Sequence, residues 1–178
     1  IRSLDWALPW GAGGQSAGLS VFLVTEAPRI LSNDVSIELQ STVRRFYRSI
    51  VDPVTGGYFI GKRPSHGMLV NGAMKVLTAL DWLSEEIHYP QQLIDTTLNE
   101  PPRPDGCHLV DAIYVLYRCN AQSSYKHSEI VTYCKQCLTL IHKHYNLDGG
   151  FSYEVGKAQK WYYGVKTSRG LAESDIHG

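Results

Sequence analysis

Three residues of the types that bind catalytic zinc stand at Asp105, Cys107 and His177. Their side chains offer an oxygen, a thiolate and an imidazole nitrogen, and a catalytic zinc takes three protein ligands and leaves one position open. Zinc in such a site would hold a substrate thiol as its thiolate, which is a nucleophile at neutral pH. The alternative is structural: Cys107 packs at a helix start, Asp105 caps that helix, and His177 is an ordinary loop residue.

Three further residues are candidates for catalysis: His66, His108 and Asp111. His66 precedes Gly67 at an expected helix start, where it could donate to a diphosphate or to a sugar carboxylate. Asp111 follows one turn into the next such helix, where a buried carboxylate could serve as general acid or base. The alternatives are a capping or solvent-facing histidine and a polar contact between helices.

Aromatic residues flank these positions and are candidates for substrate binding. Trp10 precedes the first expected inner helix, while Tyr153 and Trp161 lie in the long loop before His177. Exposed rings around a cavity can stack on sugars or shield an apolar chain. Ordinary packing of large side chains is the alternative.

The elements that must position these residues are mostly helical. Asn33 or Asp34 is expected to cap one of the helices, and only residues 58–60 suggest a strand, so the expected fold class is all-α. Apolar residues recur at helical spacing, between loops rich in Gly and Pro, over residues 18–24, 35–50, 68–82, 91–98, 109–119 and 128–144.

Two internal echoes indicate repeated helical hairpins. Two long helices are each followed by Gly-Gly-aromatic, at residues 56–58 and 149–151. Two others open with similar triplets, at residues 69–71 and 109–111. A single hairpin cannot bury its own apolar face, so neighbouring hairpins must stack.

A ring of antiparallel hairpins, an α/α toroid, fits this pattern better than a bundle. Its inner helices are expected to begin near Gln15, Gly67 and Cys107, so that their preceding loops gather around a central cavity. We expect residues 1–178 to form one domain with too few hairpins to close a ring. The chain is therefore expected to be a segment of a larger ring, or to be completed by a partner chain.

The order of these motifs resembles that of the protein prenyltransferases and terpenoid cyclases, which are α/α toroids. Residues 56–67 resemble the turn that leads into the His-Gly helix of a prenyltransferase β-subunit. Residues 103–107 resemble the segment with the family's Asp-x-Cys zinc pair, and residues 148–152 with His177 resemble the segment that supplies its zinc histidine. The resemblance implies a zinc cofactor and an isoprenoid substrate, with Arg103 near the diphosphate. The Asp-x-Cys pair is followed by a helix that opens with His108 and lacks the aromatic residues that the family has there.

Cys134 and Cys137 form a C-x-x-C motif, which in a loop suggests redox chemistry or zinc. Here the motif lies in a stretch of helical spacing without Gly or Pro. Residues three apart share a helix face, and a buried cysteine behaves as a small hydrophobic residue. We expect both to pack in the core, to bind no metal and to react poorly.

Composition excludes several classes of protein. Seventeen basic residues balance seventeen acidic ones, so the zero net charge disfavours nucleic acid and anionic membrane surfaces as partners. Hydrophobic residues make up 43% and charged residues 19%, which is typical of globular chains. No apolar run approaches the ~20 residues of a membrane span. Localisation stays open, with the cytoplasm weakly favoured.

Three functions therefore compete. The first is a transferase-like toroid acting on an isoprenoid or similar small, lipid-like substrate. The second is a carbohydrate-active toroid, either a polysaccharide lyase or a glycoside hydrolase, because these also place His, Tyr, Asp and Trp at the ends of inner helices. The third is a binding module that keeps only the scaffold. No phosphate-binding loop, dinucleotide fingerprint, serine elbow or H-E-x-x-H helix is present.

Overall fold

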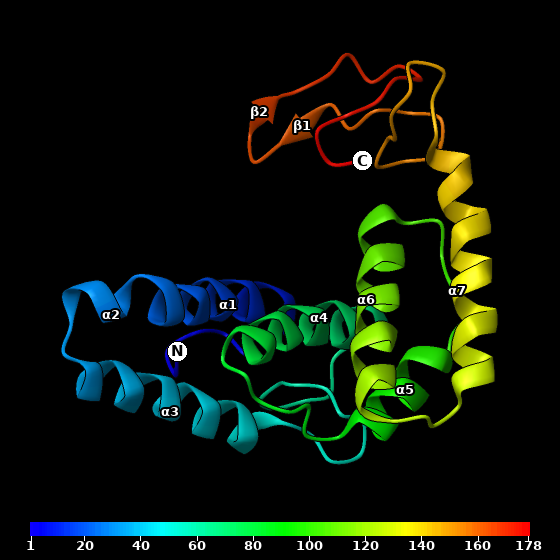
Figure 1. The fold of residues 1–178 in the computed structure, drawn as a ribbon. Coiled ribbons are helices and arrows are strands. Elements are labelled where there is room, and N and C mark those ends of the chain that lie inside the picture. The colour runs from blue at the N-terminus through cyan, green and yellow to red at the C-terminus, as the bar shows by residue number, and fades with distance from the viewer.

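The computed structural model describes residues 1–178, and the chain is mostly helical (Figure 1). The all-α expectation is confirmed, since the only sheet is a two-stranded antiparallel hairpin. None of the helices has both the length and the apolar character needed to cross a bilayer. In chain order the elements are α1 (Pro9–Thr25), α2 (Ala27–Ile30), α3 (Asn33–Ile50), α4 (His66–Trp82), α5 (Pro90–Leu98), α6 (Gly106–Gln122), α7 (His127–Ile141), a 3₁₀ turn (His142–His144), β1 (Trp161–Tyr162) and β2 (Val165–Lys166).

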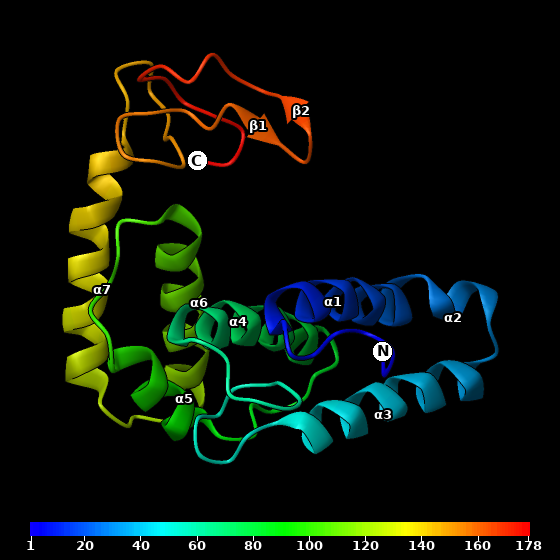
Figure 2. The same cartoon turned by 180° about the vertical axis from the view of Figure 1, so that it is seen from behind.

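Three helices, α1, α4 and α6, pack on one another in a row, with α4 between the other two. The other long helices lie against this row: α3 contacts α1, while α5 and α7 contact α6. Figures 1 and 2 show this arrangement from opposite sides, with α3 alongside α1 and α7 alongside α6. Helices of the row thus alternate along the chain with helices outside it, as expected for successive hairpins.

One apolar core runs through α1 and α3 to α7. At one end three large rings, those of Trp6, Tyr47 and Tyr58, are fully buried and meet edge to face, with centroids 6.2 and 6.3 Å apart. At the other end the core stops at α7, because no residue after Ile141 belongs to it or packs against it. Residues 145–178 therefore lie outside the core and are held by hydrogen bonds and by contacts between aromatic rings.

The start of α1 corrects one expectation. The sequence predicts an inner helix beginning near Gln15, but α1 begins at Pro9. Three glycines between these positions have low helix propensity, which hides the helix from the sequence pattern. Pro9 at the first helical position favours an earlier start, since its fixed φ suits a helix and its missing N–H has no partner there. The other long helices begin and end within three residues of the expected bounds.

Two smaller expectations are also corrected. Ser32, rather than Asn33 or Asp34, caps α3, and its hydroxyl accepts a hydrogen bond from the Val35 N–H. In the suspected strand at residues 58–60, Tyr58 forms only an isolated bridge. The real strands, β1 and β2, have two residues each, which is too short for an alternating pattern to show in the sequence.

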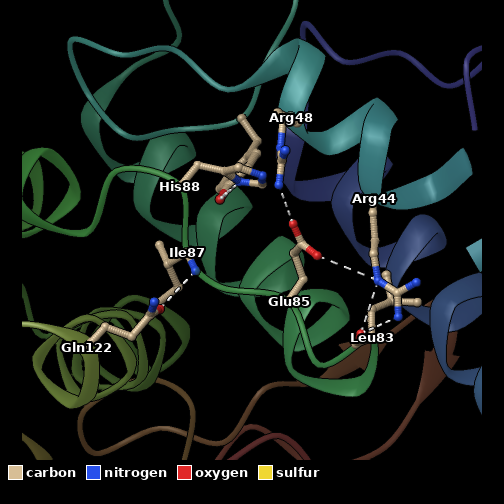
Figure 3. Close-up of polar contacts among 8 residues, drawn as sticks. Arg44, Arg48, Leu83, Glu85, Ile87, His88 and Gln122 are labelled. Atoms are coloured by element: carbon tan, nitrogen blue, oxygen red, sulfur yellow. Dashed lines mark hydrogen bonds and ion pairs between the residues drawn. The ribbon is translucent and has the colours of Figure 1, made fainter. Parts of the chain in front are cut away.

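Polar contacts fix the loop between α4 and α5 (Figure 3). The Arg44 guanidinium donates to the Leu83 carbonyl at 2.5 and 3.2 Å, and Glu85 forms an ion pair with Arg48 at 2.8 Å. From α6, the Gln122 side-chain oxygen accepts a backbone N–H of the loop at 2.9 Å. The loop thereby ties α3 to α6 and fixes the entry into α5, a helix that supports the start of α4.

The segment after α7 lies beyond the start of α6 and the end of α7 in both views (Figures 1 and 2). It is irregular apart from β1 and β2, whose register pairs Trp161 with Lys166 and Tyr162 with Val165. The chain thus brings a loop-rich segment to the end of the helix that begins with the Asp-x-Cys motif.

The close packing of α1 on α4 can be tested at Gly72. A Cβ at this position would lie 2.7 Å from the Pro9 Cβ and 3.0 Å from its carbonyl carbon. We expect Gly72→Ala to lower the free energy of unfolding by about 1–3 kcal/mol, because backbone cannot yield as a flexible side chain does. Urea unfolding monitored by circular dichroism measures this.

Gly14→Ala is the matched control, since no atom lies within 4 Å of a Cβ built there on α1. The higher helix propensity of alanine should raise the free energy of unfolding by about 0.5–1 kcal/mol. If Gly72→Ala is instead as stable as the unaltered chain, α1 and α4 do not pack as described.

Candidate functional site

The side chains of Cys107 and His177 touch, although 70 residues separate them. Cys107 is the second residue of α6, and its Sγ lies 3.3 Å from Nε2 of His177 in the C-terminal segment. Both residues are partly buried. The structure therefore brings together two of the three predicted zinc ligands.

A hydrogen bond to Gln159 orients the His177 ring. Nδ1 lies 3.1 Å from the Gln159 side-chain oxygen, which can only accept, so the ring proton is on Nδ1. In the neutral ring this leaves the lone pair on Nε2, the nitrogen that faces Cys107. This is the arrangement of a metal-binding histidine, whose second nitrogen donates to an oxygen that orients the ring.

Aromatic rings hold His177 from two directions. Tyr153 stacks on it with centroids 4.5 Å apart and planes inclined by 9°, and Tyr162 of β1 lies tilted at 5.0 Å. The Tyr153 hydroxyl also donates to Oδ1 of Asp105 at 3.5 Å. Tyr153 therefore contacts two residues of the predicted zinc site, Asp105 at the start of α6 and His177 in the C-terminal segment.

The Asp175 carboxylate holds the backbone around these residues. It accepts backbone N–H groups of Gln159 and Gly178 at 2.7 Å, of His177 at 2.9 Å and of Tyr153 at 3.0 Å. Burial alone would raise the pKa of Asp175, but these four N–H groups stabilise the charged form and lower it. Asp175 is thus an ionised anchor for the loop that carries His177.

Asp105 does cap α6, as the structural alternative proposed. Its Oδ1 accepts the backbone N–H of His108 at 3.2 Å, while Oδ2 takes part in no hydrogen bond. No group of three or more His, Cys, Asp or Glu side chains is arranged to hold a metal. The structure thus places Asp105 at the edge of the Cys107–His177 contact with one oxygen already used.

Asp111 is buried one turn beyond Cys107. Burial raises its pKa to about 7, Lys75 of α4 opposes that rise and Asp105 adds to it, and its Oδ2 has no hydrogen-bond partner. Burial, and then the nearby Asp111, also raise the pKa of the Cys107 thiol. Without a further cation, this environment favours the neutral thiol.

His66 and His108 form a second cluster, where the starts of α4 and α6 meet. Their ring centroids are 5.9 Å apart. His66 donates from Nε2 to the Thr96 carbonyl at 2.8 Å, and His108 donates from Nδ1 to the Asn71 side chain at 3.3 Å. Nε2 of His108 is buried without a partner. Burial, followed by the charge of Arg103, lowers the pKa of His108, so its ring is neutral at pH 7.

Arg103 crosses the start of α4 beside this cluster. A Cβ on Gly67 would lie 2.7 Å from one guanidinium nitrogen, so a side chain there would displace the guanidinium. Glu100 adds an opposite charge, with a carboxylate oxygen 3.3 Å from Nδ1 of His66. The structure therefore gathers His66, His108 and Arg103 at neighbouring helix N-termini, where backbone N–H groups also favour anions.

A pocket of about 240 Å³ opens beside the Cys107–His177 contact. Its lining combines His177 and Tyr153 with the apolar side chains of Leu109, Ile141 and Phe151. An apolar pocket with a few polar groups is the usual form of a small-molecule site. The pocket is large enough for part of a small apolar ligand.

Trp10 and Trp161, the two tryptophans proposed for substrate binding, are exposed but take part in none of the contacts described so far. Trp10 on α1 has Lys75 Nζ 6.0 Å from its ring centroid, which places it toward the Asp111 side of α4. Trp161 in β1 is 59% exposed. Sequence analysis missed Gln159 and Lys75 as site residues, because each acts through a long-range contact that leaves no local pattern.

The C-x-x-C motif lies in α7, as expected. Cys137 is fully buried and Cys134 partly buried, and burial raises the pKa of both thiols, that of Cys137 to about 12. Cys119 of α6 is equally buried, with its pKa raised by burial to about 12. These environments suit core cysteines.

Thiol labelling with a disulfide reagent tests these environments. In the native protein we expect Cys119 and Cys137 to stay unlabelled, and Cys107 and Cys134 to react more slowly than a free thiol, because thiolate is the reactive form. Cys134→Ser should remove one of the two slow reactions. All four thiols should react in denaturant. Rapid labelling of Cys137 in the native state would show that its helix face is misassigned.

The raised pKa of Asp111 predicts a pH-dependent stability. The native carboxyl keeps its proton up to about pH 7, whereas the unfolded one loses it near its ordinary value of 3.8. Between these values the native state binds more protons, so this contribution to stability is full at low pH and is lost as pH rises through 7. Asp111→Asn should therefore raise the free energy of unfolding by about 1–3 kcal/mol at about pH 8 and have little effect at about pH 4.

Urea unfolding at both pH values measures the difference, with the exposed Glu38→Gln as control. Glu38→Gln should change stability little at either pH. An Asp111→Asn variant that is less stable at pH 8 would mean that the carboxylate is charged and favourably paired.

No family model, curated protein or solved structure matches the chain. Its function therefore has to follow from the chemistry of the two side-chain clusters and of the pocket beside them.

Proposed function

We propose that the protein is a zinc-dependent transferase built as part of an α/α toroid, acting on an isoprenoid or similar apolar substrate. The observation that carries this proposal is the 3.3 Å contact between Cys107 Sγ and His177 Nε2. The two side chains are 70 residues apart in sequence and meet at the start of α6. Their motifs follow one another along the chain in the same order as in the prenyltransferases that the sequence resembles.

The chemistry of the donors fits zinc better than a bare thiol nucleophile. Burial and the charge of Asp111 raise the pKa of Cys107, so a metal-free thiolate is disfavoured at neutral pH. The Gln159 hydrogen bond leaves the His177 Nε2 lone pair available to a metal. Zinc bound there would hold a substrate thiol as its thiolate.

Asp105 can serve as helix cap and as third ligand at once. A carboxylate has two oxygens, and Oδ1 caps α6 while Oδ2 takes part in no hydrogen bond. Tyr153 donates to the capping oxygen and so holds the side chain in place. The two interpretations of Asp105 given by the sequence are therefore compatible.

The cluster of His66, His108 and Arg103 supports binding of an anionic end of the substrate. The cluster joins the N-termini of α4 and α6, and Arg103 carries a full positive charge. His108 is the neighbour of Cys107 in α6. An anionic leaving group held by this cluster, in this proposal a diphosphate, would thus lie at the same helix start as a substrate thiol held by zinc on Cys107.

The arrangement of helices supports the toroid part of the proposal. The row α1, α4 and α6 alternates with α3, α5 and α7 outside it, as inner and outer helices of a ring do. The starts of α4 and α6 meet where His66 faces His108, while Pro9 at the start of α1 packs on Gly72 in the second turn of α4. In this scheme the pocket lined by Leu109, Ile141 and Phe151 takes an apolar portion of the substrate.

A carbohydrate-active toroid is the second candidate, and Asp111 favours it. A buried carboxyl whose pKa is raised by burial to about 7 can act as a general acid near neutral pH. Trp10 is exposed beyond Lys75 and offers a ring for stacking on a sugar. This candidate needs no zinc, whereas the first does.

Zinc content tests the first candidate directly. We expect the full chain to bind about one zinc per molecule, as a three-ligand site does, and Cys107→Ser and His177→Gln each to abolish stoichiometric binding. Gln159→Leu should weaken zinc binding roughly 10–100-fold, because it frees the His177 ring from its orienting partner. Competition with a chromophoric chelator measures all these affinities.

Two matched controls accompany these variants. Cys134→Ser and His142→Gln remove one thiol and one exposed imidazole outside the site and should leave zinc affinity unchanged. Zinc binding that survives Cys107→Ser, or that is lost with Cys134→Ser, would contradict the assignment. A chain that binds no zinc but cleaves a polysaccharide, and loses this activity in Asp111→Asn, would establish the second candidate.

A further inference from the structure

The zero net charge of the chain hides a local excess of positive charge. Residues 155–172 contain four basic residues and no acidic one. Lys157 and Arg169 pair with glutamates just outside this range, at 3.1 and 2.8 Å. Lys160 and Lys166 have no carboxylate partner and are exposed. Lys160 precedes β1, and Lys166 is the last residue of β2.

The same hairpin exposes large apolar side chains. Trp161 is 59% exposed, Tyr163 84% and Val165 64%. Register pairs Trp161 with Lys166 across the hairpin, so an aromatic ring and a free ammonium group share one face. Val155 and Leu171 add exposed aliphatic surface at the base of this loop. Apolar groups gathered on an exposed loop, interleaved with lysines, point to a binding partner.

The tip of the hairpin supports this interpretation independently. Tyr163 has φ +47° and is followed by Gly164 at φ +80°, so both central residues of the turn adopt left-handed conformations. Such turns favour Asn, Asp or Gly, and a bulky residue there is strained. Tyr163 gains no packing in return, since it is almost fully exposed. Backbone strain at an exposed aromatic residue suggests that its side chain contacts another molecule.

We infer that the hairpin, residues 160–166, is a peripheral contact with an anionic lipid bilayer. Trp and Tyr prefer the boundary between headgroups and acyl chains, and lysines bind anionic headgroups while their stems cover apolar surface. Two unpaired lysines are few for a nucleic-acid backbone, and the exposed valines cannot stack on bases. In a symmetric contact between two copies the lysines would repel one another.

The opposite face of the hairpin, which carries the pair Tyr162 and Val165, points to the candidate site. Tyr162, between Trp161 and Tyr163, contacts His177. A bilayer on the exposed face is therefore separated by a single strand from the Cys107–His177 contact. This placement suits a lipid-borne substrate, but the bilayer contact itself does not depend on the proposed function.

Vesicle flotation of the full chain tests the inference. The protein should float with vesicles of phosphatidylcholine containing about 30% phosphatidylserine and much less with phosphatidylcholine alone. Lys160→Gln with Lys166→Gln should weaken binding about 25-fold, since each lysine contributes roughly five-fold near an anionic surface. Tyr163→Gly should weaken binding by about five-fold through lost apolar burial, while relieving the strained turn, so misfolding cannot explain the loss.

Three controls make the result decisive. Lys62→Gln with Lys135→Gln removes two exposed lysines elsewhere, and Tyr117→Ala removes an exposed tyrosine from α6; both should bind vesicles as the unaltered chain does. Chelator-treated protein should also bind equally, which separates this inference from the zinc proposal. No flotation, or flotation unaffected by the hairpin variants, would overturn it. So would a concentration-dependent dimer, seen by sedimentation, that Tyr163→Gly abolishes.

Discussion

The hydrogen bonds to Asp175 determine the geometry of the C-terminal half of the candidate site. The apolar core ends with α7, so residues 145–178 lie outside it. In its place, four backbone N–H groups converge on one carboxylate, among them those of His177, Gln159 and Tyr153. These residues respectively approach Cys107, orient the approaching ring and stack on it. A neutral asparagine at 175 could not accept the same set, because an NH2 group, which donates, replaces one of the two accepting oxygens.

The first turn of α6 connects this half of the site to the helical core. Cys107 and His108 are neighbours, so their side chains leave the helix about 100° apart and meet different partners. Cys107 faces the C-terminal segment, while His108 faces α4. Asp105 caps the turn and holds both directions fixed. A single helix start can thus present a thiol and a buried imidazole to adjacent clusters.

Helical periodicity allowed the all-α class and most of the helices to be predicted, because the apolar stripes of α3 to α7 are local features of the sequence. It failed at α1, where glycines obscure a helix that begins with Pro9. Cys107 and His177 could be paired by motif order alone, and the structure does bring them together. Gln159, Asp175 and Tyr162 could not be found this way, since a loop residue gains its role only from contacts across the fold. Total charge likewise gave no indication of the basic hairpin, because a sum does not record position.

The two ends of the Cys107–His177 contact differ in how firmly the protein holds them. Cys107 belongs to a helix anchored in the core, whereas His177 belongs to a segment held by polar bonds that water can replace. Such a segment opens locally at a lower free energy than the core unfolds. Any ligand that bridges the two residues binds only the closed form, so its binding free energy adds to the closing of the segment. Ligand occupancy and the order of the last thirty or so residues are therefore a single linked equilibrium, in which each strengthens the other.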